Sequence, residues 1–338
     1  MDQSAKFGMG VVCSLLFVVS AWPAGIPQLN LADLVTRADL VVTGRIDRID
    51  PQQGSAFDGS RRSEEKSALL SVDHVLKGPP TVGDVSVSFV VRHNPAGGNG
   101  YASVTTGEYR VFFLKDSGDH YEFVSPYYPF LPAAPGSSVK GTTAEERVLW
   151  QMAQALESPD VSSGRKERLL FELQDTQSGI LTEALRNSLQ TADRKLQLAV
   201  AVALLERNDL SAINLAEAAL IQPPLDVPRY VITNLSSAIE RGVKDPVAIP
   251  ALASIAQKAT DVESRRAAMY ALRRTNSPMA IAPLARGLSD PDFEVRYYAV
   301  VGLADISGQP KWRPLREQFQ AEENRYLSFW RDWSQAQN

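Results

Sequence analysis

The sequence predicts an α+β chain in two parts, a small N-terminal β-barrel followed by an all-α solenoid. Three observations lead to this fold class. Apolar and polar residues alternate with period two from about Leu29 to Phe130, as half-buried strands require. Beyond Ala144 the apolar residues recur at spacings of three and four, which is typical of amphipathic helices. The third observation is a helical phrase that occurs twice, at 259–277 and at 289–307.

The composition is that of an ordinary globular protein with room for two domains. The chain has 338 residues, of which 44% are hydrophobic and 22% are charged. Its net charge of −4 and its lack of a long block of like charge argue against a dedicated nucleic-acid-binding protein. Residues 240–338 carry 14 Lys and Arg against 12 Asp and Glu, which is close to balance.

The first residues have the pattern of a secretory signal peptide. Lys6 precedes an apolar run from Met9 to Trp22, which is shorter than the about 20 residues that span a bilayer. We expect residues 1–24 to be a signal peptide and the mature chain to be periplasmic or extracellular, without a membrane span. An uncleaved anchor is the alternative. The single cysteine, Cys13, lies in this segment, so the mature chain would hold no disulfide, thiol nucleophile or thiolate metal site.

Five β-rich runs follow a short expected helix, LADLVTRA, and polar or Gly/Pro breaks separate them. The runs are 38–50, 67–78, 82–92, 108–116 and 120–128. Five strands predict a small, partly open barrel over residues 28–130. The sequence PQQGSAFDGSRRSEEK between the first two runs is expected to be a break. Residues 131–143, rich in Pro, Gly, Ser and Thr, are expected to be a linker.

A solenoid of about twelve helices is expected over residues 144–338, with helices at 144–157 and 262–274 and the last two at 311–320 and 323–335. A shift of 31 residues superposes the two similar phrases. In each phrase an Asp lies four residues before an Arg, so the two can meet on one helix face, and the Arg can also reach an Asp of the neighbouring repeat. A Leu follows the Arg and fills the space between layers. The predicted stacking residues are Asp261, Arg265, Leu272, Asp292, Arg296 and Leu303.

The motif D-x-x-x-R-x-x-A-x-x-A/G-L makes residues 240–338 resemble HEAT repeats, specifically the short HEAT-like units of bacterial proteins. The resemblance implies a stack of helical units that share one core. The last helix carries Tyr326, Phe329, Trp330 and Trp333, and we expect it to cap the open end of the stack.

The N-terminal half has a second resemblance. The runs ADLVVTGRI, VDHVLKGPP and GEYRVFFL are similar to OB-like domains of the tissue-inhibitor-of-metalloproteinase class. Inhibitors of that class chelate a protease zinc through a mature N-terminal cysteine. The mature chain expected here has no cysteine, so inhibition does not follow from the resemblance.

The sequence contains no recognisable catalytic or metal-binding motif. His74, His93 and His120 are far apart in the β half and lack the spacing of metal ligands. No G-x-S-x-G occurs, and NPAGGNG at 94–100 lacks the Lys of a phosphate loop. We therefore expect no cofactor and no enzymatic activity.

The remaining candidate site is the outward face of the repeats. If Ala268 and Ala299 face the core, the positions one, five and eight after each key Arg face outward. These positions are Arg266, Tyr270 and Arg273 in one repeat and Tyr297, Val301 and Ala304 in the next. Tyr and Arg are favoured at binding hot spots, so Arg266, Tyr270, Arg273, Tyr297 and Val301 are the candidate protein-binding face.

The sequence thus predicts an exported, non-enzymatic scaffold that binds a protein partner through the solenoid face. Three alternatives remain open. The face is merely solvated, the barrel is a protease-inhibitor-like binding module, or the chain is an enzyme with an unrecognised carboxylate site. The identity of the partner and the oligomeric state do not follow from the sequence.

Overall fold

A short helix and six strands make up the N-terminal part of the described chain. The computed structural model describes residues 30–58, 61–80, 83–93 and 103–336. The helix is α1 (Leu31–Arg37), and Asn30 caps it. The strands are β1 (Leu40–Asp58), β2 (Arg61–Lys77), β3 (Asp84–His93), β4 (Tyr109–Asp116), β5 (Tyr121–Phe123) and β6 (Phe130–Pro132).

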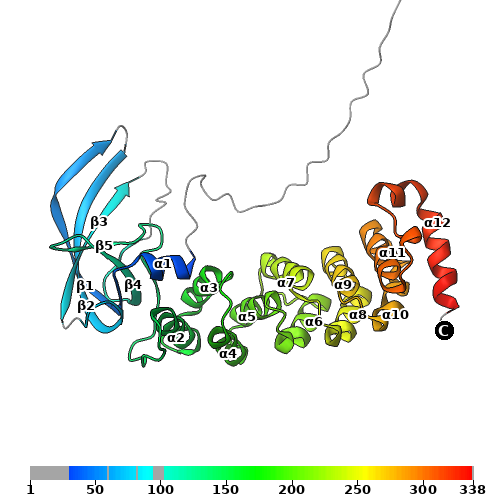
Figure 1. The fold of residues 1–338 in the computed structure, drawn as a ribbon, viewed down its shortest axis with the longest axis horizontal. Coiled ribbons are helices and arrows are strands. Elements are labelled where there is room, and N and C mark those ends of the chain that lie inside the picture. The colour runs from blue at the N-terminus through cyan, green and yellow to red at the C-terminus, as the bar shows by residue number, and fades with distance from the viewer. Residues whose placement is uncertain (1–29, 59–60, 81–82, 94–102, 337–338) are drawn as a thin grey trace, which may run out of the picture.

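The sheet closes because β1 pairs with two neighbours. It pairs antiparallel with β2 and, over Leu40–Arg45, also with β4. β2 pairs with β3, β3 runs parallel to β5, and β5 returns antiparallel to β4. The order β1-β2-β3-β5-β4-β1 is a closed five-stranded barrel, whereas the sequence predicted a partly open one (Figure 1). β6 lies beside β5 along the same edge of β4.

Gly44 permits the close approach of β1 to β2 at a register shift. A Cβ at this position would lie 2.0 Å from the carbonyl oxygen of Ser71, closer than any side chain allows. The interior of the barrel is filled by alternate residues of its strands. They include Leu40, Val42, Ile46, Leu70, Val87, Phe112 and Leu114.

The expected break between the first two strands is wrong, because β1 and β2 continue through it as one hairpin. The two strands pair from Asp50–Ser67 out to Asp58–Arg61. The register shifts once along this stretch, between Pro51 and Ser55. The hairpin extends beyond the rest of the barrel (Figure 1). β-branched and apolar residues are sparse there, so strand propensity alone missed it.

Eleven α-helices occupy the described chain beyond residue 143. They are α2 (Ala144–Glu157), α3 (Ser163–Glu172), α4 (Gly179–Ser188), α5 (Arg194–Glu206), α6 (Ile213–Ile221), α7 (Arg229–Gly242), α8 (Ile249–Lys258), α9 (Val262–Arg274), α10 (Ile281–Gly287), α11 (Phe293–Ser307) and α12 (Arg316–Gln335). Short 3₁₀ turns precede α6, α8, α10 and α12. α12 consists of two helical segments that meet at a kink at Glu322, whose backbone is not helical, so the break expected between the last two helices is present.

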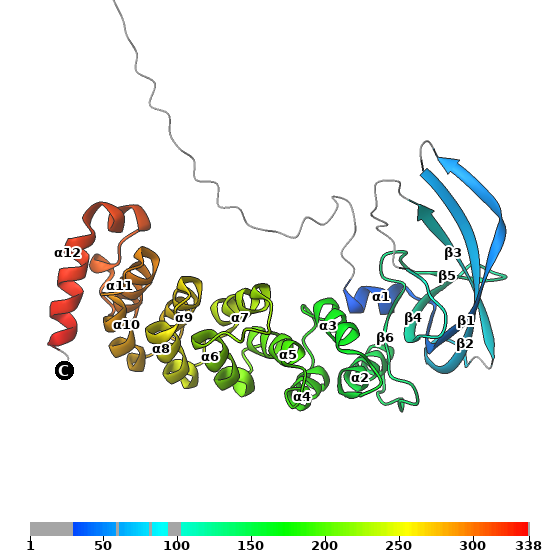
Figure 2. The same cartoon turned by 180° about the vertical axis from the view of Figure 1, so that it is seen from behind.

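The helices stack in two layers to form an elongated solenoid. α5, α7, α9 and α11 follow one another in one layer, and α6, α8 and α10 follow one another in the other (Figures 1 and 2). Each unit therefore contacts its neighbours and little else, as in repeat proteins. In the part of the chain that the structure describes, no helix is both long and apolar enough to cross a bilayer.

Aspartates cap three helices of the first layer, α5, α9 and α11. Asp193, Asp261 and Asp292 each accept a hydrogen bond from the backbone N–H three residues ahead, at 3.0–3.1 Å. Such N-caps contribute about 1 kcal/mol each. At the C-terminal end of α7, Gly242 lies against α5. A Cβ on this residue would come within 1.9 Å of the Leu205 carbonyl oxygen.

One hydrophobic core joins the barrel wall to the helices. The cluster runs from Leu31 through Val41 and Phe113 into the solenoid and ends at Trp330. The segment expected to be a linker, 131–143, takes part in this packing. Its Ala133 and Ala134 are buried, and the Ser137 hydroxyl donates to the side chain of Gln151 on α2. The barrel therefore lies directly on the first helices, while the domain boundaries drawn from the sequence stay a prediction.

Candidate protein-binding face of the helical repeats

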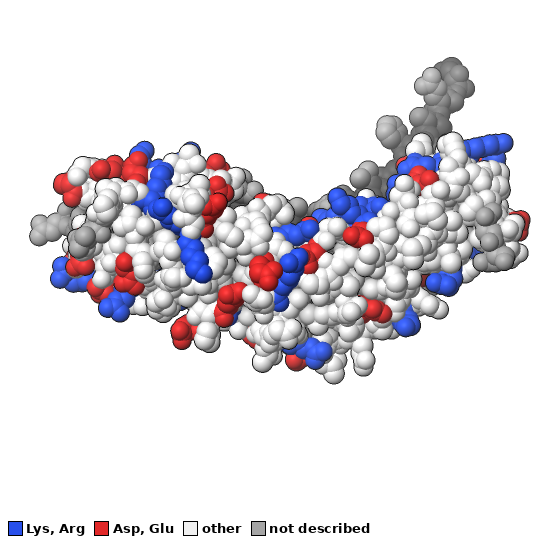
Figure 3. Space-filling view, turned by 60° about the horizontal axis from the view of Figure 1, so that its bottom comes forward, with Lys and Arg blue, Asp and Glu red and all other residues white. Residues whose placement is uncertain are grey.

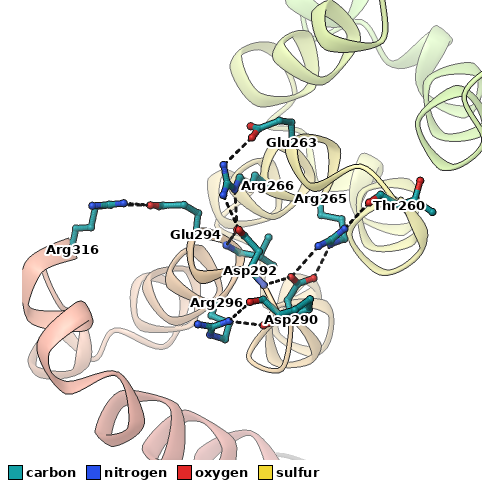
Figure 4. Close-up of polar contacts among 11 residues, drawn as sticks. Thr260, Glu263, Arg265, Arg266, Asp290, Asp292, Glu294, Arg296 and Arg316 are labelled. Atoms are coloured by element: carbon teal, nitrogen blue, oxygen red, sulfur yellow. Dashed lines mark hydrogen bonds and ion pairs between the residues drawn. The ribbon is translucent and has the colours of Figure 1, made fainter. Parts of the chain in front are cut away.

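Arginines at the starts of α9 and α11 connect each repeat to the next. Arg265 on α9 donates to Asp290, which precedes α11, with an Nε–Oδ2 distance of 2.9 Å. Arg296 on α11 donates to Glu323 on α12 at 2.5 Å. Both guanidiniums also donate to backbone carbonyls of the turn before their own helix, including that of Thr260 (Figure 4). Each arginine thus satisfies the polar groups of a turn and crosses to the next unit.

A second arginine of α9 makes a two-point contact with α11. Arg266 donates to both carboxylate oxygens of Asp292, at 2.9 and 2.7 Å, and to Glu263 at 2.8 Å (Figure 4). The hydrogen bond from Arg266 holds the pKa of the Asp292 carboxyl below its usual range. Because Asp292 also caps α11, this pair fixes the start of α11 relative to α9.

A third contact links α9, α11 and the turn before α12. The Asp305 carboxylate accepts from Arg273 on α9 at 3.0 Å and from Arg313 at 2.5 Å. An acid shared by two guanidiniums orders three successive elements at once. Contacts of the same kind recur toward the barrel, with Arg241 on Glu206 and Arg186 on Asp209.

Two tyrosines lie between these ion pairs. The rings of Tyr270 on α9 and Tyr298 on α11 meet edge to face, with centroids 5.2 Å apart. Burial raises the pKa of Tyr298 to about 12. We call the surface formed by Arg266, Tyr270, Arg273, Tyr298 and Asp305 the ladder face. It presents half-buried aromatic rings held among charges that are already paired.

These helices match a known repeat family. The family model of HEAT repeats matches residues 249–330, from α8 into α12. Residues 249–330 are therefore similar to HEAT repeats. No curated protein matches the chain. The match confirms the resemblance seen in the sequence over the C-terminal units, and the closed barrel with a helical region after it confirms the predicted fold class.

Within the residues that match the HEAT-repeat model, the predicted outward residues divide into two groups. Arg266, Tyr270 and Arg273 lie on the ladder face, although both arginines are engaged in ion pairs. Tyr297 instead stacks on Phe293 and contacts Phe319 of α12, so it belongs to the packing under the last helix.

The prediction that Val301 and Ala304 face outward is wrong. Their exposed fractions are 1% and 2%. The 31-residue shift placed Val301 where Tyr270 lies one repeat earlier, but α9, α10 and α12 all pack on α11. The position that is half-buried at Tyr270 is therefore fully buried at Val301, and the repeat shift does not carry exposure from one unit to the next.

The predicted stacking residues lie in the framework of the HEAT repeats. Leu272 and Leu303 are fully buried between the layers. Asp261 and Asp292 cap their helices, and the expected pairing within one helix is replaced by contacts between repeats. Arg265 and Arg296 make those contacts.

The structure offers no obvious metal centre in the residues that it describes. Among them, no group of three or more His, Cys, Asp or Glu could hold a metal ion. His74 lies 3.5 Å from the Thr43 hydroxyl in the barrel, and His120 pairs with Asp119 in an exposed turn. The side chain of His93 lies outside the described residues.

Sequence reasoning missed Tyr298 and Asp305 of the ladder face. Tyr298 directly follows the predicted Tyr297. Because successive residues point to different sides of a helix, Tyr298 lies on the ladder face while Tyr297 packs under the last helix. A signal for Asp305 existed, because it lies 32 residues beyond Arg273, close to one repeat length.

Proposed function

We propose that the chain is an exported, non-enzymatic scaffold that binds a protein partner through the ladder face. HEAT repeats present extended surfaces to other proteins. The observation that carries the proposal for this surface is the Tyr270–Tyr298 pair, set among arginines whose orientation is fixed by paired acids. Tyr and Arg dominate binding hot spots.

Preorganisation supports this choice of surface. Arg266 and Arg273 are held by Asp292 and Asp305 before any partner arrives. A partner would not need to order these long side chains, whose immobilisation costs about 0.5–1.5 kcal/mol each. The aromatic pair supplies contact area that has few rotamers to lose.

Charge distribution favours a protein over a nucleic acid. Acidic and basic side chains are interspersed over the side of the molecule shown in Figure 3, without a broad field of one sign. Nucleic-acid grooves need a basic stripe that follows the phosphates. A mixed surface suits a partner that carries both charges, because complementary pairs then select it.

The export part of the proposal rests on the first 24 residues, which lie outside the described part of the chain. Lys6 and the short apolar run after it fit a cleaved signal peptide. Removing this segment removes Cys13, and a chain without cysteine has no thiol to be oxidised outside the cytosol.

Site-specific photo-crosslinking tests the proposed surface. A photoreactive residue replaces Tyr270 on the ladder face in one full-length variant, and exposed Gln257 on α8 or Arg286 on α10 in two controls. We expect a discrete adduct with one envelope or secreted protein at position 270 only, reduced by the substitution Arg273→Ala. Equal adducts at all three positions, or adducts only at the two control positions, would contradict binding at the ladder face.

A further inference from the structure

A pocket lies where the barrel meets the first helices, away from the ladder face. It has a cavity volume of about 280 Å³ and opens to solvent on one side. The barrel contributes β4, β6 and the residues before β4, while α3 contributes two arginines. The lining residues are Ser103, Thr105, Glu108, Arg110, Phe130, Pro132, Arg165 and Arg168.

Arg110 on β4 is buried without using all its donors. Its side chain is only 10% exposed. One terminal nitrogen, Nη2, donates to the Thr105 hydroxyl at 3.0 Å and to the Glu108 carboxylate. The other, Nη1, is buried with no hydrogen-bond partner. Since buried guanidinium nitrogens are nearly always paired, this donor is an unexplained feature of the pocket.

The guanidinium of Arg110 also stacks on the ring of Phe130. Its Cζ lies 3.7 Å from the centroid of the Phe130 ring. Stacking of this kind leaves the edge of the guanidinium plane free for hydrogen bonds. Burial lowers the pKa of Arg110, and the charges of Arg165 and Arg168 lower it further. The site thus concentrates positive charge that the protein alone only partly neutralises.

α3 brings the other two guanidiniums to the same place. Arg165 donates from Nη2 to the backbone carbonyl of Tyr109 at 2.6 Å, which holds it against β4. Arg168 is about half exposed, and its Nε lies 3.6 Å from Glu172. Both therefore reach the pocket from the helical side, opposite Arg110.

We propose that this pocket binds a small dianion that carries a phosphate or carboxylate group. The lining holds three guanidiniums and one carboxylate, Glu108, and Glu172 beside the lining pairs with Arg168, so an excess of positive charge remains. The fork of a guanidinium matches the oxygens of phosphate and carboxylate. Such a ligand would neutralise the excess and contact both the barrel and α3.

The rest of the lining defines the body of the ligand. Phe130 and Pro132 provide an apolar wall, and Ser103 and Thr105 provide hydroxyl groups. The volume is near the lower end of small-molecule sites, which span about 300–1,000 Å³. The pocket therefore fits a phosphate monoester or a short dicarboxylate, and it excludes a polymer chain from its interior.

Titration calorimetry on the mature full-length chain tests the proposal with four probes at constant ionic strength. These are inorganic phosphate, glycerol phosphate, succinate and, as a neutral compound, glycerol. We expect saturable binding of a phosphate or of succinate, which distinguishes the two sources of the anionic group, and none of glycerol.

Three variants decide whether the site is this pocket. Arg168→Gln, at an exposed position, should raise the Kd about tenfold, the effect of losing one charge-assisted contact. Glu108→Gln should lower the Kd, because it removes the competing carboxylate. Arg48→Gln, on an exposed ion pair of β1, should leave it unchanged. Absence of saturable binding by every anion, or equal affinity in wild type, Arg168→Gln and Glu108→Gln, would overturn the proposal.

Discussion

Arg265 and Asp290 come from successive repeats, and their side chains meet at 2.9 Å while only 14% and 11% exposed. The same guanidinium donates to the carbonyls of Ala259 and Thr260 in the turn before α9. One side chain therefore closes a turn and joins two units. Because both groups are largely withdrawn from water, loss of either leaves the other charge without its counter-charge.

Arg265→Ala should destabilise the helical part by about 2–3 kcal/mol, somewhat less than the about 3–5 kcal/mol for breaking a fully buried pair. The physical reason is an uncompensated Asp290 carboxylate and two unsatisfied carbonyls. Urea unfolding followed by circular dichroism measures the effect. The control is Arg48→Ala, on the exposed Arg48–Asp50 pair, which should change stability by less than about 0.5 kcal/mol. Equal effects of both substitutions would show that the repeats are not held together by Arg265.

Gly242→Ala should separate α7 from α5. The added Cβ would come within 1.9 Å of the Leu205 carbonyl oxygen, and backbone cannot move aside as a flexible side chain can. We expect a loss of about 3 kcal/mol or more, as for other overpacked sites at their upper range. Gly179→Ala, with nothing within 4 Å of the new Cβ, should leave the melting temperature unchanged or raise it. A melting curve of Gly242→Ala that coincides with wild type would contradict the close packing of these helices.

Acid should weaken the junction between α9 and α11 through Asp292. The hydrogen bond from Arg266 lowers the pKa of Asp292 below its ordinary 3.8. The stability that this pair contributes is therefore fully present above pH 3.8 and is lost as pH falls through the lower, folded-state pKa. Urea midpoints measured from about pH 6 to about pH 3 should fall less steeply for Asp292→Asn than for wild type. Asn remains a good N-cap, so parallel curves would mean that the Arg266–Asp292 pair contributes no pH dependence.

Trp330→Ala should expose the end of the stack. Trp330 is fully buried, and its Nε1–H donates to the Trp312 carbonyl at 3.1 Å. We expect the free energy of unfolding to fall by about 3–5 kcal/mol. Amide hydrogen exchange should accelerate relative to wild type more in α10, α11 and α12 than in α5. Ser328→Ala, on the exposed side of the same helix, serves as the control. Exchange that accelerates equally in the barrel and in α11 would show that Trp330 is not a local cap.

Local signals explain what could be predicted from the sequence. α2 and α9 have the bounds that the helical spacing indicated. Their starts are fixed locally, because Thr143 and Asp261 each accept a hydrogen bond from the backbone N–H three residues ahead. The barrel strands were recognised for a similar reason, since alternation of period two is visible in each run alone. Ion pairs between repeats could also be predicted, because the repeat length places an acidic residue of the next unit near each arginine.

Features that depend on tertiary neighbours could not be predicted. Val301 is fully buried although the equivalent Tyr270 of the preceding repeat is half-buried, and no pattern inside α11 shows this difference. Arg110 and Arg165 are remote in sequence and meet only because α3 packs against β6 and β4. The closure of the barrel likewise depends on the pairing of β1 with β4, which is a non-local contact.

The continuous core from the barrel wall into the helices also bears on the order in which the molecule forms. Synthesis and export both deliver the barrel before the helices, and domains generally fold as they emerge. A finished barrel offers α2 an apolar surface that an isolated helix pair would lack. Each later repeat then adds to the one before it, since contacts run mainly between neighbours. Folding thus proceeds in one direction, from the barrel through the repeats to α12, which covers the end of the stack.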